Sequence, residues 1–354
     1  MNLWDVFLFA FNAIMPIILL IVVGYLLKRI GFLKEDFLKM ANKFVFNVCL
    51  PCLLFMNVYS IGSFSEINWS VVIYSEIAIF IFFFIGMLFV KLFVKDAKQK
   101  GVILQCVFRS NFAIIGLSLA QSLGGEEGMK VAAILSAFSI PTFNILAVLA
   151  LSMYNDGKAD IKKVLLNIVK NPLIIGVIVG LVFLGIRSLI PYENVINYTV
   201  DQSTLEIVET TVRKYAFTLK DNLPFLYKSV ENISKIASPL ALIVLGGTFN
   251  FQTVKGMIKE IIYGTSARIL IVPGVAIFTA VLLSKYTNLI SFDKTVYPAL
   301  IALFGSPVAV SSAIMAQNMD NDGELAGQLV VWTSLFSILT IFIFVVVLRA
   351  VGLL

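Results

Sequence analysis

Two apolar stretches decide the fold of this chain: residues 109–125, RSNFAIIGLSLAQSLGG, and residues 302–319, ALFGSPVAVSSAIMAQNM. Both are hydrophobic enough to lie in a membrane, yet glycine, serine or proline interrupts each of them. Non-helical backbone at membrane depth is tolerated only where it is buried in protein or lines a cavity. Two such segments at matching places in two halves of a chain indicate a transporter site built from broken helices.

The spacing of prolines and glycines indicates an internal repeat. Pro16 and Gly24 lie eight positions apart in an apolar run, and so do Pro172 and Gly180. A further proline in each half precedes the broken segment by nearly the same distance, 67 residues before Ser118 and 68 before the second break. One such coincidence carries little weight, because proline and glycine are frequent in membrane helices. Three in the same order predict two related halves.

The composition is that of an integral membrane protein. Apolar residues make up 59% of the 354 residues, charged residues 14%, and the mean hydropathy is +0.96. A span needs about 20 apolar residues. The sequence predicts an all-α polytopic fold with ten spans near residues 8–28, 38–59, 70–93, 100–123, 129–153, 168–190, 236–251, 262–284, 295–318 and 325–351. The first five would form one repeat (1–153), and the rest a second (168–354), joined by a cytoplasmic linker (154–167).

Lysine and arginine cluster in alternate loops, which predicts the orientation of the chain. They flank the first, third, fifth and seventh loops and are sparse in the others. Basic loops stay in the cytoplasm, so both termini are expected outside the plasma membrane. Five spans per half then make the second half inverted relative to the first. The formal net charge of +6 needs no nucleic-acid partner, because these loops account for it.

Three ionisable residues fall within the predicted spans: Glu76, Arg109 and Arg268. Charges inside a membrane are costly and are functional hypotheses by default. We favour an arrangement in which Arg109 and Arg268 extend toward the cytoplasmic surface, and Glu76 lies at the outer interface. The alternative is a coupling or charge role for each, with Glu76 as a proton or cation group.

The two breaks offer polar groups and free helix ends. Asn111 supplies an amide beside the first break, where Gly116 is expected to permit unwinding and Ser118 to offer a hydroxyl. At the second break Pro307 lacks an N–H and begins a new helix. The residues around it are Gly305, Ser306, Ser311 and Ser312. A helix N-terminus attracts carboxylate, so an anionic substrate is expected. The alternative, that small residues only allow close packing, remains open.

Residues 191–236 form an insertion in an outside loop between the sixth and seventh spans. Val208, Val212, Tyr215 and Leu219 recur there at helical spacing, which favours an amphipathic surface helix. A loosely ordered loop is the equal alternative. The three cysteines lie in predicted spans, and with no histidine in the chain neither a metal site nor a catalytic centre is expected.

At these residues the chain resembles the auxin efflux carrier family, which includes plant PIN-type carriers and bacterial malate or malonate permeases. The segments that carry the resemblance are ANKFVFNVCLPCLLF, RSNFAIIGLSLAQSLGG, KNPLIIGVIVG and the stretch that begins GSPVAVSSAIMAQNMDNDGELAGQ. The resemblance implies ten helices as two inverted sets of five, with the fourth and ninth crossing at their breaks. It also implies a scaffold of spans 1, 2, 6 and 7, a mobile domain of spans 3–5 and 8–10, elevator-type alternation and a homodimer.

By this resemblance, Asn111 takes the place of the asparagine that holds the substrate carboxylate, and Pro307 that of the ninth-span crossing proline. One departure concerns the fourth span, where the family's usual G-x-P is replaced by Gly116-Leu117-Ser118. Either Ser118 preserves the kink through Gly116, or the crossing is less sharply fixed.

The expected function is secondary transport of a small organic carboxylate anion. Asn111, Ser118, Ser306, Ser311 and Ser312 are the predicted substrate contacts. Gly116, Gly305 and Pro307 are expected to maintain the crossing, and Phe112 and Phe304 to form an apolar wall. The driving force stays open between sodium held by broken-helix carbonyls, a proton on Glu76, and uniport. A sodium- or proton-coupled symporter related to the bile-acid carriers is the alternative function, and an anion channel a weaker one.

Overall fold

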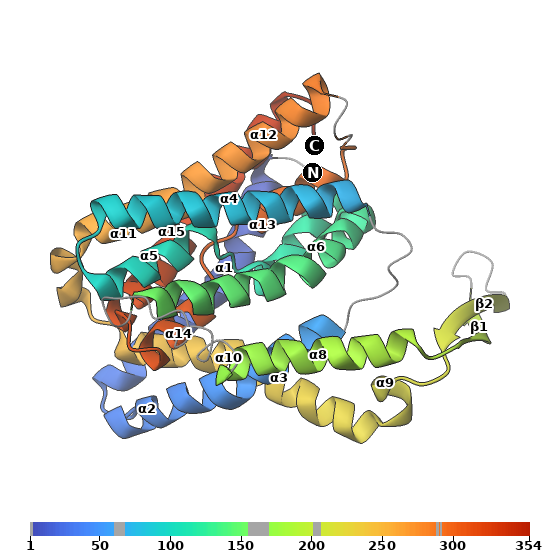
Figure 1. Ribbon diagram of the computed structural model, residues 1–354, viewed down its shortest axis with the longest axis horizontal. Helices are drawn as coiled ribbons and strands as arrows, with labels where there is room; N and C mark the ends of the chain where they lie inside the picture. Colours follow the sequence, from blue (N-terminus) through green and yellow to red (C-terminus); the bar gives the residue numbers. More distant parts are fainter. Residues whose placement is uncertain (1–2, 60–67, 155–169, 201–206, 288–289, 291) are drawn as a thin grey trace.

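The computed structural model describes residues 3–59, 68–154, 170–200, 207–287, 290 and 292–354. Helices lie over all ten segments expected to cross a membrane (Figure 1). Within the described residues, six helices are long and apolar enough to do so. The protein is therefore helical and polytopic, while the ten-span count and the inverted repeat stay predictions. The expected linker, residues 154–167, lies almost wholly outside the described residues.

The first half of the chain contains two π-helical turns between its α-helices. Such turns are rare and recur at functional sites. The elements are α1 (Leu3–Arg29), α2 (Glu35–Phe44), the π-turn η1 (Val45–Cys49), α3 (Leu50–Tyr59), α4 (Trp69–Phe93), α5 (Ala97–Phe108), the π-turn η3 (Phe112–Gly116) and α6 (Leu117–Met153). Gly125, with φ +63°, interrupts α6 where the chain turns between the expected fourth and fifth spans.

The second half begins with α8 (Pro172–Ser188), two strands and the short helix α9 (Leu219–Asn222). After them come α10 (Pro224–Thr248), the 3-10 turn η4 (Phe251–Gly256), α11 (Ile258–Ser266), the π-turn η5 (Ala267–Ile271), α12 (Val272–Tyr286), α13 (Val296–Gly305), α14 (Ser311–Asn318) and α15 (Gly323–Ala350). The seventh span was expected from residue 236, but α10 begins at Pro224, a residue suited to the first position of a helix.

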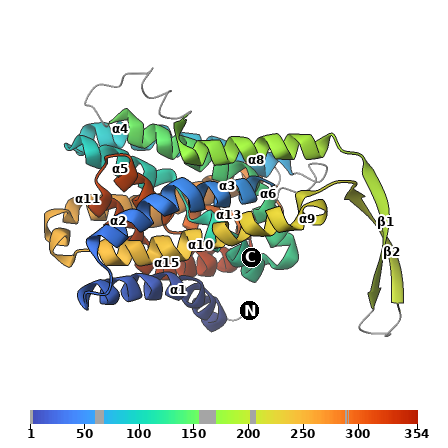
Figure 2. The ribbon, with the colours of Figure 1, turned by 90° about the horizontal axis from the view of Figure 1, so that it is seen from below.

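The inserted segment contains a pair of β-strands, which the all-α expectation did not include. Strands β1 (Tyr192–Val200) and β2 (Ile207–Tyr215) pair antiparallel, with Tyr192 opposite Tyr215. The helix expected from Val208, Val212 and Tyr215 is therefore wrong, and so is a loosely ordered loop over the two strands. Valine, isoleucine and threonine are abundant in both strands and favour β-structure, which outweighed the four helically spaced residues. The hairpin extends beyond the ends of α8 and α10 (Figures 1 and 2).

Glycines bring α1, α3, α8 and α10 into close contact. A Cβ on Gly24 would lie 2.1 Å from the Ile243 carbonyl oxygen of α10, and one on Gly246 1.9 Å from that of Ile21 in α1. The α3–α8 pair is equally tight, with Gly176 against the backbone of Pro51. Small residues let membrane helices pack at backbone distance. The repeated Pro-to-Gly spacing thus reflects helix packing at Gly24 and at Gly180, which lies against α3.

A second group of helices packs on this first group. It contains α4, α5, α6 and α11 to α15, of which α4, α5, α6, α11 and α12 lie above α3, α8 and α10 in Figure 1. Helix α13 is buried along its whole length, between α6, α12 and α15. The two interrupted segments belong to this group and face α3 and α10.

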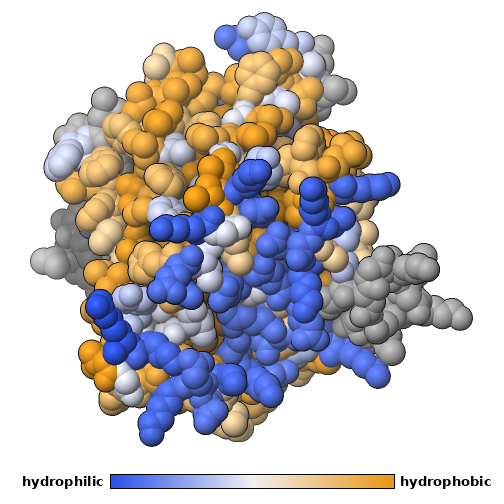
Figure 3. Space-filling view, turned by 90° about the vertical axis from the view of Figure 1, so that its left-hand side faces the viewer, coloured by the Kyte–Doolittle hydropathy of each residue, from blue (hydrophilic) through white to orange (hydrophobic). Residues whose placement is uncertain are grey.

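At one end of the molecule, hydrophilic residues gather over the centre and lower part of the surface, with apolar surface above and to the left (Figure 3). This end carries the turns between α1 and α2, α4 and α5, and α10 and α11 (Figure 1). The basic residues of these turns include Lys28, Arg29, Lys95, Lys255 and Lys259. The hairpin and both chain termini lie away from this end (Figures 1 and 2).

The close contact at Gly246 predicts a specific loss of stability. In Gly246→Ala the new Cβ would collide with the α1 backbone, which cannot withdraw as a side chain can. We expect the free energy of unfolding to fall by about 1–3 kcal/mol, as is typical of overpacking. The fall is detected as a decrease in the half-loss temperature, which is the temperature at which half of the purified protein leaves the monodisperse size-exclusion peak. Gly185→Ala in α8, with open space around the new Cβ, is the control and should not lower this temperature. Equal behaviour of both variants would contradict the prediction.

Candidate functional site

The two interrupted helices meet at their breaks. Helix α5 ends at Phe108 and α13 ends at Gly305, and after each of these helices the backbone is extended before the next helical turn begins. Ser110 and Val308 form an antiparallel β-bridge, and the Asn111 backbone N–H donates to the Pro307 carbonyl at 2.8 Å. Backbone groups that leave the helices are thus paired with one another, as burial requires.

The first break lies earlier than expected. Residues 109–111 are the extended ones, whereas Gly116 has helical φ and ψ of −61° and −50°. Gly116 is needed for space instead, because a Cβ there would lie 2.0 Å from the ring of Phe112. Gly305 ends α13 and has no such crowding, its nearest neighbour being 3.7 Å from an added Cβ. The chain is extended at residues 109–111 because this segment pairs with the backbone of Pro307 and Val308.

Arg109 lies beside the crossing and is only 2% exposed, so the expected extension to the membrane surface is wrong. Its Nη2 donates to Asn144 Oδ1 at 2.7 Å and to Ser311 Oγ at 2.8 Å. Its Nη1 faces Gln105 Oε1 at 3.4 Å and the sulfur of Met315. All these partners are neutral, and Arg109 forms no ion pair with a carboxylate among the described residues. A buried positive charge without a counter-ion favours an anionic ligand.

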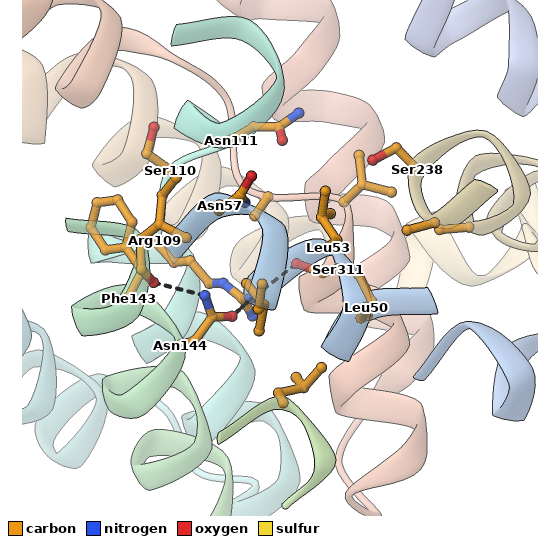
Figure 4. A pocket seen from close by; sticks show the side chains of 17 residues that line it. Leu50, Leu53, Asn57, Arg109, Ser110, Asn111, Phe143, Asn144, Ser238 and Ser311 are labelled. Atoms are coloured by element: carbon orange, nitrogen blue, oxygen red, sulfur yellow. Dashed lines mark hydrogen bonds between the residues drawn. The ribbon is translucent and has the colours of Figure 1, made fainter. Parts of the chain in front are cut away.

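The guanidinium lines a cavity between the two groups of helices (Figure 4). The crossing contributes Ser110, Asn111 and Ser311, while the facing wall is mainly apolar and includes Leu50 and Leu53 of α3. The other lining residues are Leu54, Asn57, Ile140, Phe143, Asn144, Leu173, Ala237, Ser238, Ala241, Ala309 and Val310. The cavity volume is about 40 Å³, far below the roughly 300–1,000 Å³ of typical small-molecule sites. An organic acid therefore fits only if the two groups of helices move apart.

The predicted site residues divide between the cavity and its surroundings. Asn111 and Ser311 line the cavity, and the Asn111 amide nitrogen is buried without a hydrogen-bond partner among the described residues. The Ser306 hydroxyl donates instead to Ala302 of its own helix, and the Ser312 carbonyl accepts from Gln105. Neither Ser306 nor Ser312 lines the cavity. The side chain of Ser118 lies outside the described part of the structure.

The remaining expected residues lie behind the crossing. Phe112 and Phe304 are fully buried, and neither lines the cavity, so neither forms its apolar wall. Glu76 in α4 is partly buried, and its carboxylate accepts a hydrogen bond from Ser139 of α6 at 3.0 Å. Its position at the outer interface stays a prediction. Arg268 is fully buried and donates to backbone carbonyls, which excludes the extended position expected for it.

Sequence reasoning missed several lining residues. Asn144 receives a hydrogen bond from Arg109, and Asn57 and Ser238 lie on the facing helices α3 and α10. Asn144 stands in an otherwise apolar span shortly after Pro141, and an amide at membrane depth is the signal that would have marked it. Asn57 and Ser238 gave no such signal, because both fall near the ends of predicted spans, where polar residues are tolerated.

The model of the family described as membrane transport protein matches residues 9–345. The chain belongs to the auxin efflux carrier family. An uncharacterized transporter from Methanocaldococcus jannaschii is 24% identical over 343 residues, which cover 93% of this chain and 96% of that protein. This auxin efflux carrier family member is thus a multi-pass membrane transporter.

The hydroxyl of Thr333 in α15 supports the crossing, and its removal should weaken it. Thr333 Oγ1 accepts from the Val308 N–H at 3.2 Å. Thr333→Val leaves that buried N–H unsatisfied, which should lower the free energy of unfolding by about 1–3 kcal/mol. The effect is detected as a decrease in the half-loss temperature. Thr340→Val is the control, because its hydroxyl bonds only within α15, to Ser337. An equal or smaller loss for Thr333→Val would contradict this role.

Proposed function

We propose that this transporter carries a small organic carboxylate anion across the plasma membrane by elevator-type alternating access. The observation that carries the proposal is the Arg109 guanidinium, buried in the cavity with neutral partners only. Arginine binds carboxylates through two parallel hydrogen bonds and keeps its charge when buried. Substrate contacts are proposed for Arg109, Asn111, Asn144 and Ser311.

Two helix starts add to the attraction for an anion. The helical turns that follow Asn111 and Val310 both begin at the cavity. Helix N-termini carry partial positive charge and unpaired N–H groups. The Asn111 amide can donate two hydrogen bonds and has no described partner for its nitrogen. These groups would replace the water that a carboxylate loses on binding.

The position of the cavity supports movement of one helix group against the other. Its polar groups come mostly from the crossing, α6 and α14, while α3, α8 and α10 provide most of the apolar face. We propose α1 to α3, α8 and α10 as the scaffold, because their glycine contacts make them a tightly packed unit. The second group would carry the substrate past it. A homodimer stays a prediction.

The proposed orientation places the basic turns in the cytoplasm and both termini outside. The hydrophilic end with Lys28, Lys95 and Lys255 supports it, and the termini lie away from that end (Figures 1 and 3). A membrane potential that is negative inside favours exit of an anion by about 2.3 kcal/mol per charge per 100 mV.

Removal of the Arg109 charge tests the substrate class. Proteoliposomes with the wild-type protein are screened for uptake of labelled mono- and dicarboxylates. For each accepted acid, Arg109→Gln should lower kcat/KM about 10- to 100-fold, because a hydrogen bond to a charged group contributes about 1.5–3 kcal/mol. Arg109→Lys keeps the charge but loses the planar group that forms two parallel hydrogen bonds, so its kcat/KM should lie between those of the wild type and Arg109→Gln.

Arg349→Gln, at the end of α15 and away from the cavity, is the control and should transport as the wild type does. Uptake of neutral or cationic solutes instead of acids would contradict the proposal. Unchanged kinetics of Arg109→Gln for every accepted acid would contradict the assignment of the site.

Asn111 should contribute to affinity through its side chain. Asn111→Ala leaves its backbone bond to Pro307 intact but removes the amide, so we expect KM to rise about 5- to 10-fold, equivalent to ~1 kcal/mol for a hydrogen bond. Asn47→Ala in η1, whose amide bonds only to Lys43 one turn away, is the control. A KM for Asn111→Ala equal to that of the control would remove Asn111 from the site.

A further inference from the structure

Arg268 has a hydrogen-bond partner for each of its donors. It lies on the π-turn η5 and is 0% exposed. Its Nε donates to the Ser306 carbonyl at 3.1 Å, and its Nη1 to those of Val107 at 3.3 Å and Phe108 at 3.1 Å. Its Nη2 donates to the carbonyls of Leu303 at 3.4 Å and Phe304. A guanidinium has five N–H groups, and all of them are used.

These carbonyls belong to the ends of the two interrupted helices. Val107 and Phe108 end α5, and Leu303 and Phe304 lie in the last turn of α13. Carbonyls in the last turn of a helix lack partners within it and carry its partial negative charge. In transporters with broken helices, such carbonyls are the groups that coordinate a coupling cation. Here a side chain of the protein binds all five.

The charge of Arg268 is balanced by these carbonyls rather than by an acid. All its hydrogen bonds go to backbone oxygens, and no described carboxylate pairs with it. A sodium ion at this place would have to displace the Arg268 guanidinium from these carbonyls. The ion would then lie beside the displaced guanidinium, which is itself positively charged and buried. Both the occupied ligands and the like charge oppose sodium binding.

We propose that Arg268 is the resident cation of the crossing, so that no sodium ion binds between the half-helices and transport needs no sodium gradient. A sodium ion would leave and return in each cycle, whereas Arg268 is covalently fixed. The charge that the protein itself moves across the membrane is therefore the same when the substrate is bound and when the empty site returns. This proposal rests on the proposed function for its transport experiment only, because sodium binding is measured without a substrate.

The first experiment measures sodium binding to the purified wild-type protein. The half-loss temperature is recorded in NaCl from 0 to 200 mM, with choline chloride added to keep the ionic strength constant. We expect a change below about 1 °C, because Arg268 already occupies the carbonyls of the crossing that could bind sodium. A saturable rise of several degrees that is specific to sodium would overturn the proposal.

The second experiment removes the resident charge. Arg268→Met keeps most of the side-chain length but frees the five carbonyls, so its half-loss temperature should fall in choline chloride and partly recover in NaCl. Lys259→Met on the exposed side of α11 is the control and should show neither effect. A stable Arg268→Met protein with no response to sodium would overturn the role of Arg268 as a substitute for the ion. If Arg268→Met does not fold, the wild-type titration still decides.

The third experiment measures uptake of an accepted acid by wild-type proteoliposomes in NaCl and in choline chloride, with the membrane potential fixed by potassium and valinomycin. Initial rates should agree within about 1.5-fold. A loss of fivefold or more without sodium would overturn the proposal. If no acid is transported, the proposed function fails, whereas the sodium titration still tests the role of Arg268 independently.

Discussion

Hydrogen bonds from one buried guanidinium hold the ends of the two interrupted helices together. Helices α5 and α13 stop within the protein, and their last carbonyls have no partner in their own helices. Arg268 supplies five donors at the point where these helix ends meet. Burying a charge is costly unless every donor is used, and here the same bonds satisfy the charge and the helix ends. The short β-bridge of Ser110 and Val308 follows directly from this arrangement.

The crossing separates two buried arginines with different surroundings. Arg268 lies among backbone carbonyls behind the crossing, and its hydrogen-bonding capacity is filled by the fold itself. Arg109 lines the cavity on the other side and contacts neutral side chains. The positive charge of Arg268 is thus balanced by backbone carbonyls, whereas that of Arg109 has only neutral side-chain partners. This difference is the basis for proposing Arg109, and not Arg268, as a substrate contact.

Glycines and π-turns decide how the remaining helices approach this centre. Gly24, Gly176 and Gly246 allow backbone contact within the group formed by α1, α3, α8 and α10. The π-turns η3 and η5 adjoin the crossing, and η5 carries Arg268. A cavity of about 40 Å³ lies between the two groups, and its lining is mostly apolar.

The sequence by itself determined that this is a helical membrane protein of a transporter family, and it located both breaks to within a few residues. Apolar runs of span length, basic turns and the Gly-Ser-Pro motif are local signals, so one sequence carries them in full. It also identified Asn111 and Ser311, which line the cavity. Only the tertiary structure decided that residues 109–111 are the extended ones, that Arg109 and Arg268 are buried, and that Asn144 joins the site. Those outcomes depend on contacts between segments far apart in the chain, as between residues 110 and 308. The β-hairpin was missed for a related reason, because its strands are stabilised by pairing with each other rather than by the periodicity of either one.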